Sequence, residues 1–175
     1  MNQTILIGLV SLLASPLFAQ QATSPDGKWV VFVKPGHGPA IETGSGPTEP
    51  KELWQRDPQG HTELMLRTHD AKDPKDIVAG FEGLQFSSDG KLVYFITPNY
   101  ATGGCVHVLD TTNKHEHFVT SGELVNILST DDGDRLLVTS RCYDQIPKGG
   151  SVYWDYFIVT PEGQELKKLG MPFHP

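Results

Sequence analysis

The sequence has few cysteines and no excess of positive charge, and each shortage argues against a class of function. Of its 175 residues, 14 are Lys or Arg and 21 are Asp or Glu, which gives a formal net charge of −7. General nucleic-acid binders need a basic surface to displace counterions from phosphates, so that class of partner is disfavoured. The two cysteines form no C-x-x-C pair, which argues against a redox or metal motif built on that spacing.

Signatures of catalysis and phosphate binding are also missing. The chain contains no G-x-S-x-G or H-E-x-x-H motif, and Asp89-Gly90-Lys91-Leu92 lacks the surrounding residues of a phosphate-binding loop. Its carboxylates are scattered, so no acid and base pair can be chosen. His107, His115 and His117 lie near one another in the sequence, but a metal site would need convergent carboxylates or more imidazoles. We therefore expect no catalytic residue, no bound metal and no cofactor.

Residues 1–19 have the pattern of a signal peptide. They carry no Asp, Glu, Lys or Arg, and the segment from Ile5 to Ala14 is nearly all apolar before Ser15-Pro16 interrupts it. The apolar run is shorter than the roughly 20 residues that span a bilayer, so an uncleaved anchor is the weaker interpretation. Cleavage after Ala19 would leave residues 20–175 as one domain without a membrane span, in the periplasm or secreted.

Turn-forming residues are abundant, and one turn motif occurs three times. The 18 Gly and 13 Pro favour short strands over long helices. Asp26-Gly27, Asp89-Gly90 and Asp132-Gly133 each precede a run rich in β-branched, aromatic or leucine side chains: WVVFV, LVYFI and LLVTS. Because glycine accepts a positive φ without a Cβ clash, Asp-Gly is a favoured hairpin turn. Each copy therefore predicts two strands joined by a turn.

Further strands follow each of these turns. The pairs of apolar runs are LWQR and ELML, VHVL and EHFV, and YFIV followed by EL, each pair separated by a short polar turn. Each unit thus reads as four short strands, with the first strand of the first unit missing or very short. Four-stranded units repeating at a period in the forties are typical of β-propeller blades. We place the units at about residues 20–70, 81–122 and 123–170.

The turn S-P-D-G-K-W with its apolar run resembles the blade repeat of TolB-like β-propellers, which are the WD-like repeats of bacterial periplasmic proteins. The resemblance implies an all-β fold of about three four-stranded antiparallel blades. An unrelated antiparallel sandwich is the alternative. Closed propellers have four to eight blades, so three blades would leave sheet edges and faces uncovered. Two chains could combine into a six-bladed homodimer, the blade number of TolB-like propellers, or one chain could form a partial, open stack.

The loops between the second and third strands of the units should project from one end of the fold. These loops cover residues 35–51, 98–104 and 141–151. Binding residues concentrate on loops held by a rigid scaffold, and Tyr and Asn suit protein recognition. The expected contact residues are Asn99, Tyr100, Tyr143, Asp144 and Lys148.

The same alignment places Cys105 and Cys142 in neighbouring loops, and in an oxidising compartment such a pair predicts a disulfide. Two separate thiols are the alternative. Together these observations predict a non-catalytic protein-binding or scaffolding module whose partner is another envelope protein. A small periplasmic hydrolase with an active site built from the loops is the alternative function.

Overall fold

The computed structural model describes residues 21–44, 46–98, 103–143 and 152–170, without the side chains of Cys142, Tyr143 and Val152. The expected signal peptide lies outside the described residues. No helix in the described part of the chain is long and apolar enough to cross a membrane.

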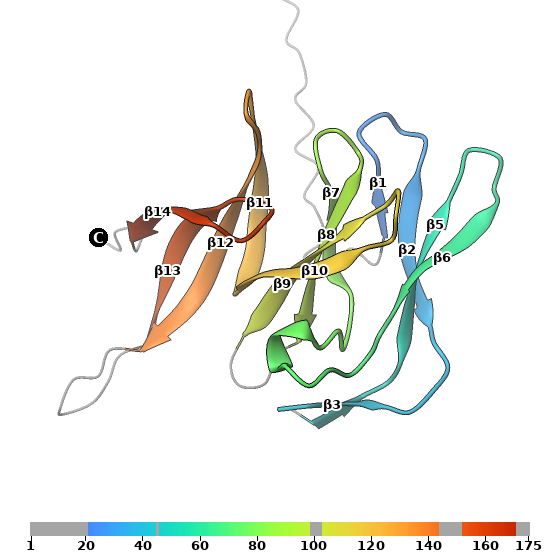
Figure 1. Cartoon of the computed structure of the whole chain (residues 1–175), viewed down its shortest axis with the longest axis horizontal. Coiled ribbons are helices and arrows are strands. Elements are labelled where there is room, and N and C mark those ends of the chain that lie inside the picture. Colours follow the sequence, from blue (N-terminus) through green and yellow to red (C-terminus); the bar gives the residue numbers. More distant parts are fainter. Residues whose placement is uncertain (1–20, 45, 99–102, 144–151, 171–175) are drawn as a thin grey trace, which may run out of the picture.

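Three antiparallel sheets of four strands each make up the described structure, which confirms the predicted all-β fold with three propeller-type blades (Figure 1). The first sheet has the order β1 (Gln21–Thr23), β2 (Val30–Pro35), β5 (Lys51–Arg56) and β6 (Thr62–Arg67). The second has β7 (Glu82–Phe86), β8 (Leu92–Pro98), β9 (Gly104–Asp110) and β10 (Glu116–Ser121). The third has β11 (Glu123–Thr130), β12 (Gly133–Tyr143), β13 (Val152–Val159) and β14 (Glu165–Gly170).

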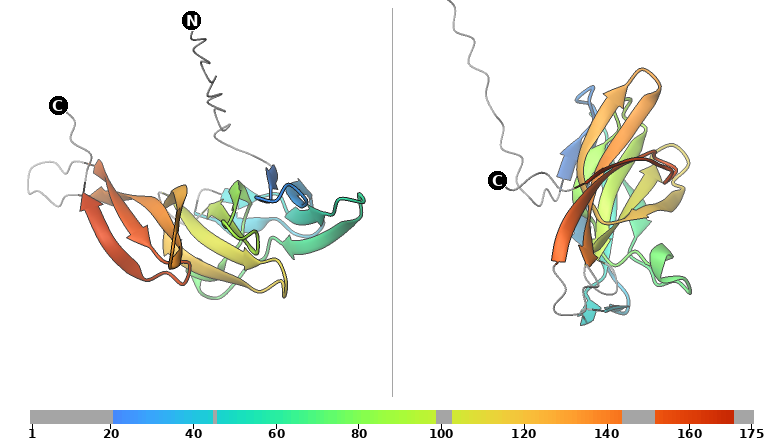
Figure 2. Two further views of the ribbon diagram at one scale, coloured as in Figure 1. Left: turned by 90° about the horizontal axis from the view of Figure 1, so that it is seen from above. Right: turned by 90° about the vertical axis from the view of Figure 1, so that its left-hand side faces the viewer.

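Two smaller elements lie in the connections between these strands. A two-stranded hairpin of β3 (Ile41–Thr43) and β4 (Gly46–Thr48) lies in the connection between β2 and β5, where the sequence suggested only a loop. A short 3-10 helix, η1 (Pro74–Asp76), lies between the first and second sheets. The three sheets stand in a row with the second in the middle, so the first and third lie at opposite ends of the array (Figure 2).

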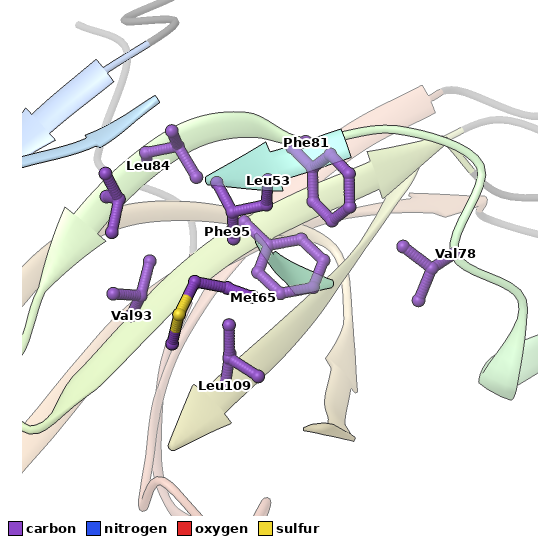
Figure 3. Packing of buried hydrophobic residues seen from close by; sticks show 9 residues of the cluster. Leu53, Met65, Val78, Phe81, Leu84, Val93, Phe95 and Leu109 are labelled. Carbon is purple, nitrogen blue, oxygen red and sulfur yellow. The ribbon is translucent and has the colours of Figure 1, made fainter. Parts of the chain in front are cut away.

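The middle sheet is buried on both faces because β8 and β9 place apolar side chains alternately on either side. Val93, Phe95 and Leu109 pack toward the first sheet (Figure 3), and Tyr94 and Val108 pack toward the third. Two apolar clusters therefore lie between adjacent sheets. The first cluster contains Val31, Leu53, Met65, Val78, Phe81, Leu84, Val93, Phe95 and Leu109. The second contains Tyr94, Val106, Val108, Val119, Leu124, Leu136, Val138 and Val159.

The first two Asp-Gly turns have the same hydrogen-bond pattern. In the first, the Ser24 hydroxyl donates to Asp26 Oδ1 over 2.6 Å and accepts from the Trp29 backbone N–H over 2.9 Å. In the second, the Ser87 hydroxyl donates to Asp89 Oδ1 over 2.7 Å. The serine and aspartate of the motif thus stabilise the turn that the sequence predicts.

The third copy of the motif has a different geometry. Strands β11 and β12 pair as far as Thr130 and Gly133, so the chain reverses within Asp131 and Asp132. The expectation that all three turns are alike is therefore wrong for this copy. Here Gly133 is already part of the strand pairing, whereas Gly27 and Gly90 lie within the turn. The acidic side chain that matters here is Asp134, which is 8% exposed.

Asp134 connects the third sheet to the turn of the second. Its carboxylate accepts from the Ser88 backbone N–H over 3.0 Å and from the Ser88 hydroxyl over 2.6 Å. A carboxylate that accepts two hydrogen bonds at a part-buried position stabilises the contact between these elements.

The β13–β14 turn approaches the second sheet closely at Gly163. Its φ is +85°, and a Cβ atom there would lie 2.3 Å from the Val119 carbonyl oxygen. Gly60, in the corresponding turn of the first sheet, has a φ of +88° but nothing within 4 Å of a built Cβ. The two glycines share a backbone conformation and differ in their surroundings.

We expect Asp134→Ala to lower the free energy of unfolding by about 2 kcal/mol, because Ser88 loses both acceptors. Asp132→Ala, an exposed change in the same turn, should cost less than about 0.5 kcal/mol. Urea unfolding of the purified variants measures both. Equal midpoints for the two variants would contradict the assigned contact.

Gly60→Ala should cost about 1 kcal/mol, the strain of a positive φ. Gly163→Ala should cost about 2 kcal/mol more, because its Cβ would also overlap a backbone oxygen of the second sheet. Thermal unfolding of the pair measures the difference. Equal losses would mean that the β13–β14 turn does not pack against β10.

Candidate functional site

Most of the loop residues predicted to contact a partner lie outside the described residues. This holds for Asn99, Tyr100, Asp144 and Lys148, while Tyr143 is described by its backbone alone, at the end of β12. Their role in binding stays a prediction. The search for a site among the described residues therefore turns to the sheets themselves.

The two cysteines lie on neighbouring sheets, with Cys105 on β9 and Cys142 on β12. Cys105 is 1% exposed and lies opposite Thr97 in the register of β8 and β9. The Thr97 hydroxyl accepts from the Ala79 backbone N–H over 2.7 Å. Strand alternation places Cys105 on the same face as His107, which is the face toward the first sheet rather than the third. The Cys142 side chain lies outside the described residues, and the disulfide stays a prediction.

The three histidines considered for metal binding divide between two faces. His107 is fully buried, and its Nδ1 forms a close hydrogen bond with Glu116 Oε1. His117 pairs with Val108, so it lies on the opposite face of the sheet, where its ring is 5.9 Å from that of His115. No group of three or more potential metal ligands occurs among the described residues. The sequence did not reveal the pairing of His107 with Glu116.

The outer face of the first sheet, which points away from the second, carries its own cover. Phe32 and Trp54 are paired across β2 and β5 on this face. The Lys34 ammonium lies 4.3 Å from the Trp54 ring centroid and 5.2 Å from that of Phe32, and the Arg56 guanidinium lies 5.7 Å from the Phe32 centroid. These cations and their aliphatic stems shield the aromatic row from water.

A buried carboxylate extends this cover. Glu52 is 7% exposed, and its two oxygens accept from Arg67 Nε over 3.0 Å and from Trp54 Nε1 over 2.9 Å. These hydrogen bonds, that from Arg67 first, lower the pKa of Glu52 below its ordinary value of 4.5. The outer face of the first sheet is thus a capped end, as the terminal units of a repeat array require.

The outer face of the third sheet, which points away from the second, carries a row of aromatic and aliphatic side chains. Strand register places Leu137 opposite Ile158, Thr139 opposite Tyr156, and Arg141 opposite Trp154 on this face. The Trp154 side chain is 42% exposed. Within the described part of the chain, four of the five exposed large hydrophobic side chains belong to this sheet, the fifth being Trp29: Val125, Trp154, Leu166 and Leu169.

The outer face of the third sheet is therefore the candidate functional site. Propeller blades pack against a neighbour on both faces, and this face has the aromatic and aliphatic composition of such a contact. Sequence reasoning missed it by searching the loops. The missed signal is in WDYFI, where apolar and aromatic residues occupy both alternating sets of strand positions and so predict burial on two faces.

The sequence matches no family model, and the comparison with curated proteins finds no match either. Among solved structures, the chain resembles the acylaminoacyl peptidase of Pyrococcus horikoshii, with a TM-score of 0.55 and 12% identity over 89% of this chain. The chain spans about a quarter of that protein, 25% of its length. A match to TolB from Acinetobacter baumannii has a TM-score of 0.41 and 14% identity, covering 83% of this chain and 41% of TolB. The likeness to the peptidase is one of fold alone.

We expect Glu52→Gln to destabilise the protein at neutral pH, with a deficit that shrinks as the pH falls. The folded-state pKa of Glu52 lies below its unfolded value, so its stabilising contribution is complete above about 4.5 and is lost as the pH drops through the lower folded value. Urea unfolding over a series of acidic buffers measures this trend. Glu49→Gln, a change at an exposed carboxylate, is the matched control and should leave the urea midpoint at neutral pH nearly unchanged. A Glu52→Gln deficit independent of pH would contradict the assignment.

Proposed function

We propose that this protein is an exported, non-catalytic protein-binding module built from TolB-like blades, with a partner in the cell envelope. The observation that carries the proposal is the outer face of the third sheet, where the described residues leave Trp154, Tyr156 and Ile158 wholly or partly exposed in one row along β13. Tryptophan and tyrosine at the centre of a contact commonly supply much of its binding energy. The pattern of residues 1–19 supports export.

The asymmetry of the array supports one binding end over two. The first sheet covers its aromatic row with Lys34 and Arg56, whereas the third leaves Trp154 exposed. An exposed apolar patch on an otherwise charged surface commonly marks an interaction site. The loops that hold Asn99 and Lys148 remain a second predicted contact region.

Two alternative functions would each require a different structural feature. A small periplasmic hydrolase needs a nucleophile and a base within hydrogen-bond reach of each other. A six-bladed homodimer needs the capped face of the first sheet to meet the third sheet of a second copy. Neither is favoured by the contacts described above.

A photoreactive amino acid in place of Trp154 tests the proposal in the cells that produce the full chain. We expect irradiation to give one adduct, larger than the chain and of defined mass, from position 154 and also from position 156. The same amino acid in place of Trp29, which is 39% exposed on the first turn, is the matched control and should give no such adduct.

Three results of this experiment would count against the proposal. Absence of any adduct from positions 154 and 156, with the variants folded and exported, would overturn it. An equal adduct from position 29 would remove the assignment to the third sheet. An adduct composed of two copies of the chain would favour the homodimer.

A further inference from the structure

We infer that the outer face of the third sheet binds a protein surface that is acidic as well as apolar. This inference rests on the proposed function and adds the chemistry of the partner. Its basis is the arrangement of charge around the apolar row of β13.

Cations border this row on two neighbouring strands. Arg141 on β12 lies opposite Trp154 in the strand register, and Lys167 on β14 lies opposite Ile158. Arg135 is two residues before Leu137 on β12, so its side chain lies on the same face. Its guanidinium donates to the Asp134 carbonyl over 2.8 Å.

Among the described residues at strand positions of this face, one carboxylate accompanies the cations. Glu123 is paired with Thr139 and so shares the face, at the edge formed by β11. The described strand positions of this face thus carry more cations than carboxylates, although the whole chain has a formal net charge of −7. Complementary charge around an apolar centre speeds association and selects the correct partner.

Electrostatics disfavours a second copy of this chain as the occupant. Two third sheets placed face to face would set one face bordered by Arg141 and Lys167 against an identical one. The first sheet of a second copy would present Lys34 and Arg56 instead. Like charges opposite one another cost free energy in either arrangement. A partner with Asp or Glu around an apolar patch avoids that cost.

The geometry also favours a protein over a lipid surface. Tyr156 and Ile158 are only partly exposed and lie within a sheet, so they do not form a protruding apolar wedge of the kind that inserts into a lipid surface. Aromatic residues and arginine are enriched at protein interfaces.

Charge reversal combined with the photoreactive residue at position 154 tests the inference in the full chain. We expect Arg141→Glu with Lys167→Glu to reduce the yield of adduct about tenfold, because both cations face the partner. The matched control is Lys28→Glu with Lys72→Glu, which changes the net charge equally at exposed positions outside the third sheet. It should keep the yield within about twofold. Urea unfolding of both double variants verifies that each is folded.

Sequencing of the cross-linked partner peptide gives the second readout. We expect Asp or Glu within or next to the cross-linked segment. An adduct that forms equally well with the reversed charges, or a partner peptide without acidic residues, would overturn the inference while the proposed function stands. A cross-linked second copy would overturn it too, as would flotation of the full chain with phosphatidylglycerol vesicles but not with phosphatidylcholine vesicles. Absence of an adduct from the parent chain would overturn both.

Discussion

The burial of the middle sheet on both of its faces is the constraint on which the remaining structure depends. Strands β8 and β9 direct Phe95 and Leu109 to one side and Tyr94 and Val108 to the other, and each set needs an apolar sheet against it. The first and third sheets supply those surfaces. Burying apolar area is the main favourable contribution to folding, so the three sheets stabilise one another and depend on the middle one.

Polar contacts then fix how the third sheet sits on the second. Asp134 accepts two hydrogen bonds from Ser88, and the turn containing Gly163 approaches the Val119 carbonyl too closely for any side chain. Apolar packing is non-directional, whereas these contacts require a particular register between the sheets. Together they define the orientation of β13 and therefore of the candidate site.

The outer faces of the first and third sheets, at the two ends of the array, differ in composition. A terminal sheet has an outer face that no neighbour covers. At the first sheet, cations lie over Phe32 and Trp54, and Glu52 is paired with Arg67. At the third sheet, Trp154 stays exposed beside Arg141. One end is adapted to water, and the other has the composition of an interface.

The sequence by itself determined the class of fold, the number of four-stranded units and the first two turns, because strand alternation and the Ser-x-Asp-Gly pattern are local properties of the chain. It did not reveal the hairpin of β3 and β4, the different third turn, or the contact of Asp134 with Ser88, which joins residues 46 positions apart. For the candidate site, the run WDYFI indicates burial on two faces but not which face is left without a neighbouring sheet. Every strand of a blade reads as half-buried or buried in the sequence, and only the tertiary structure decides which sheet face a neighbour covers and which one is left to water or to a partner.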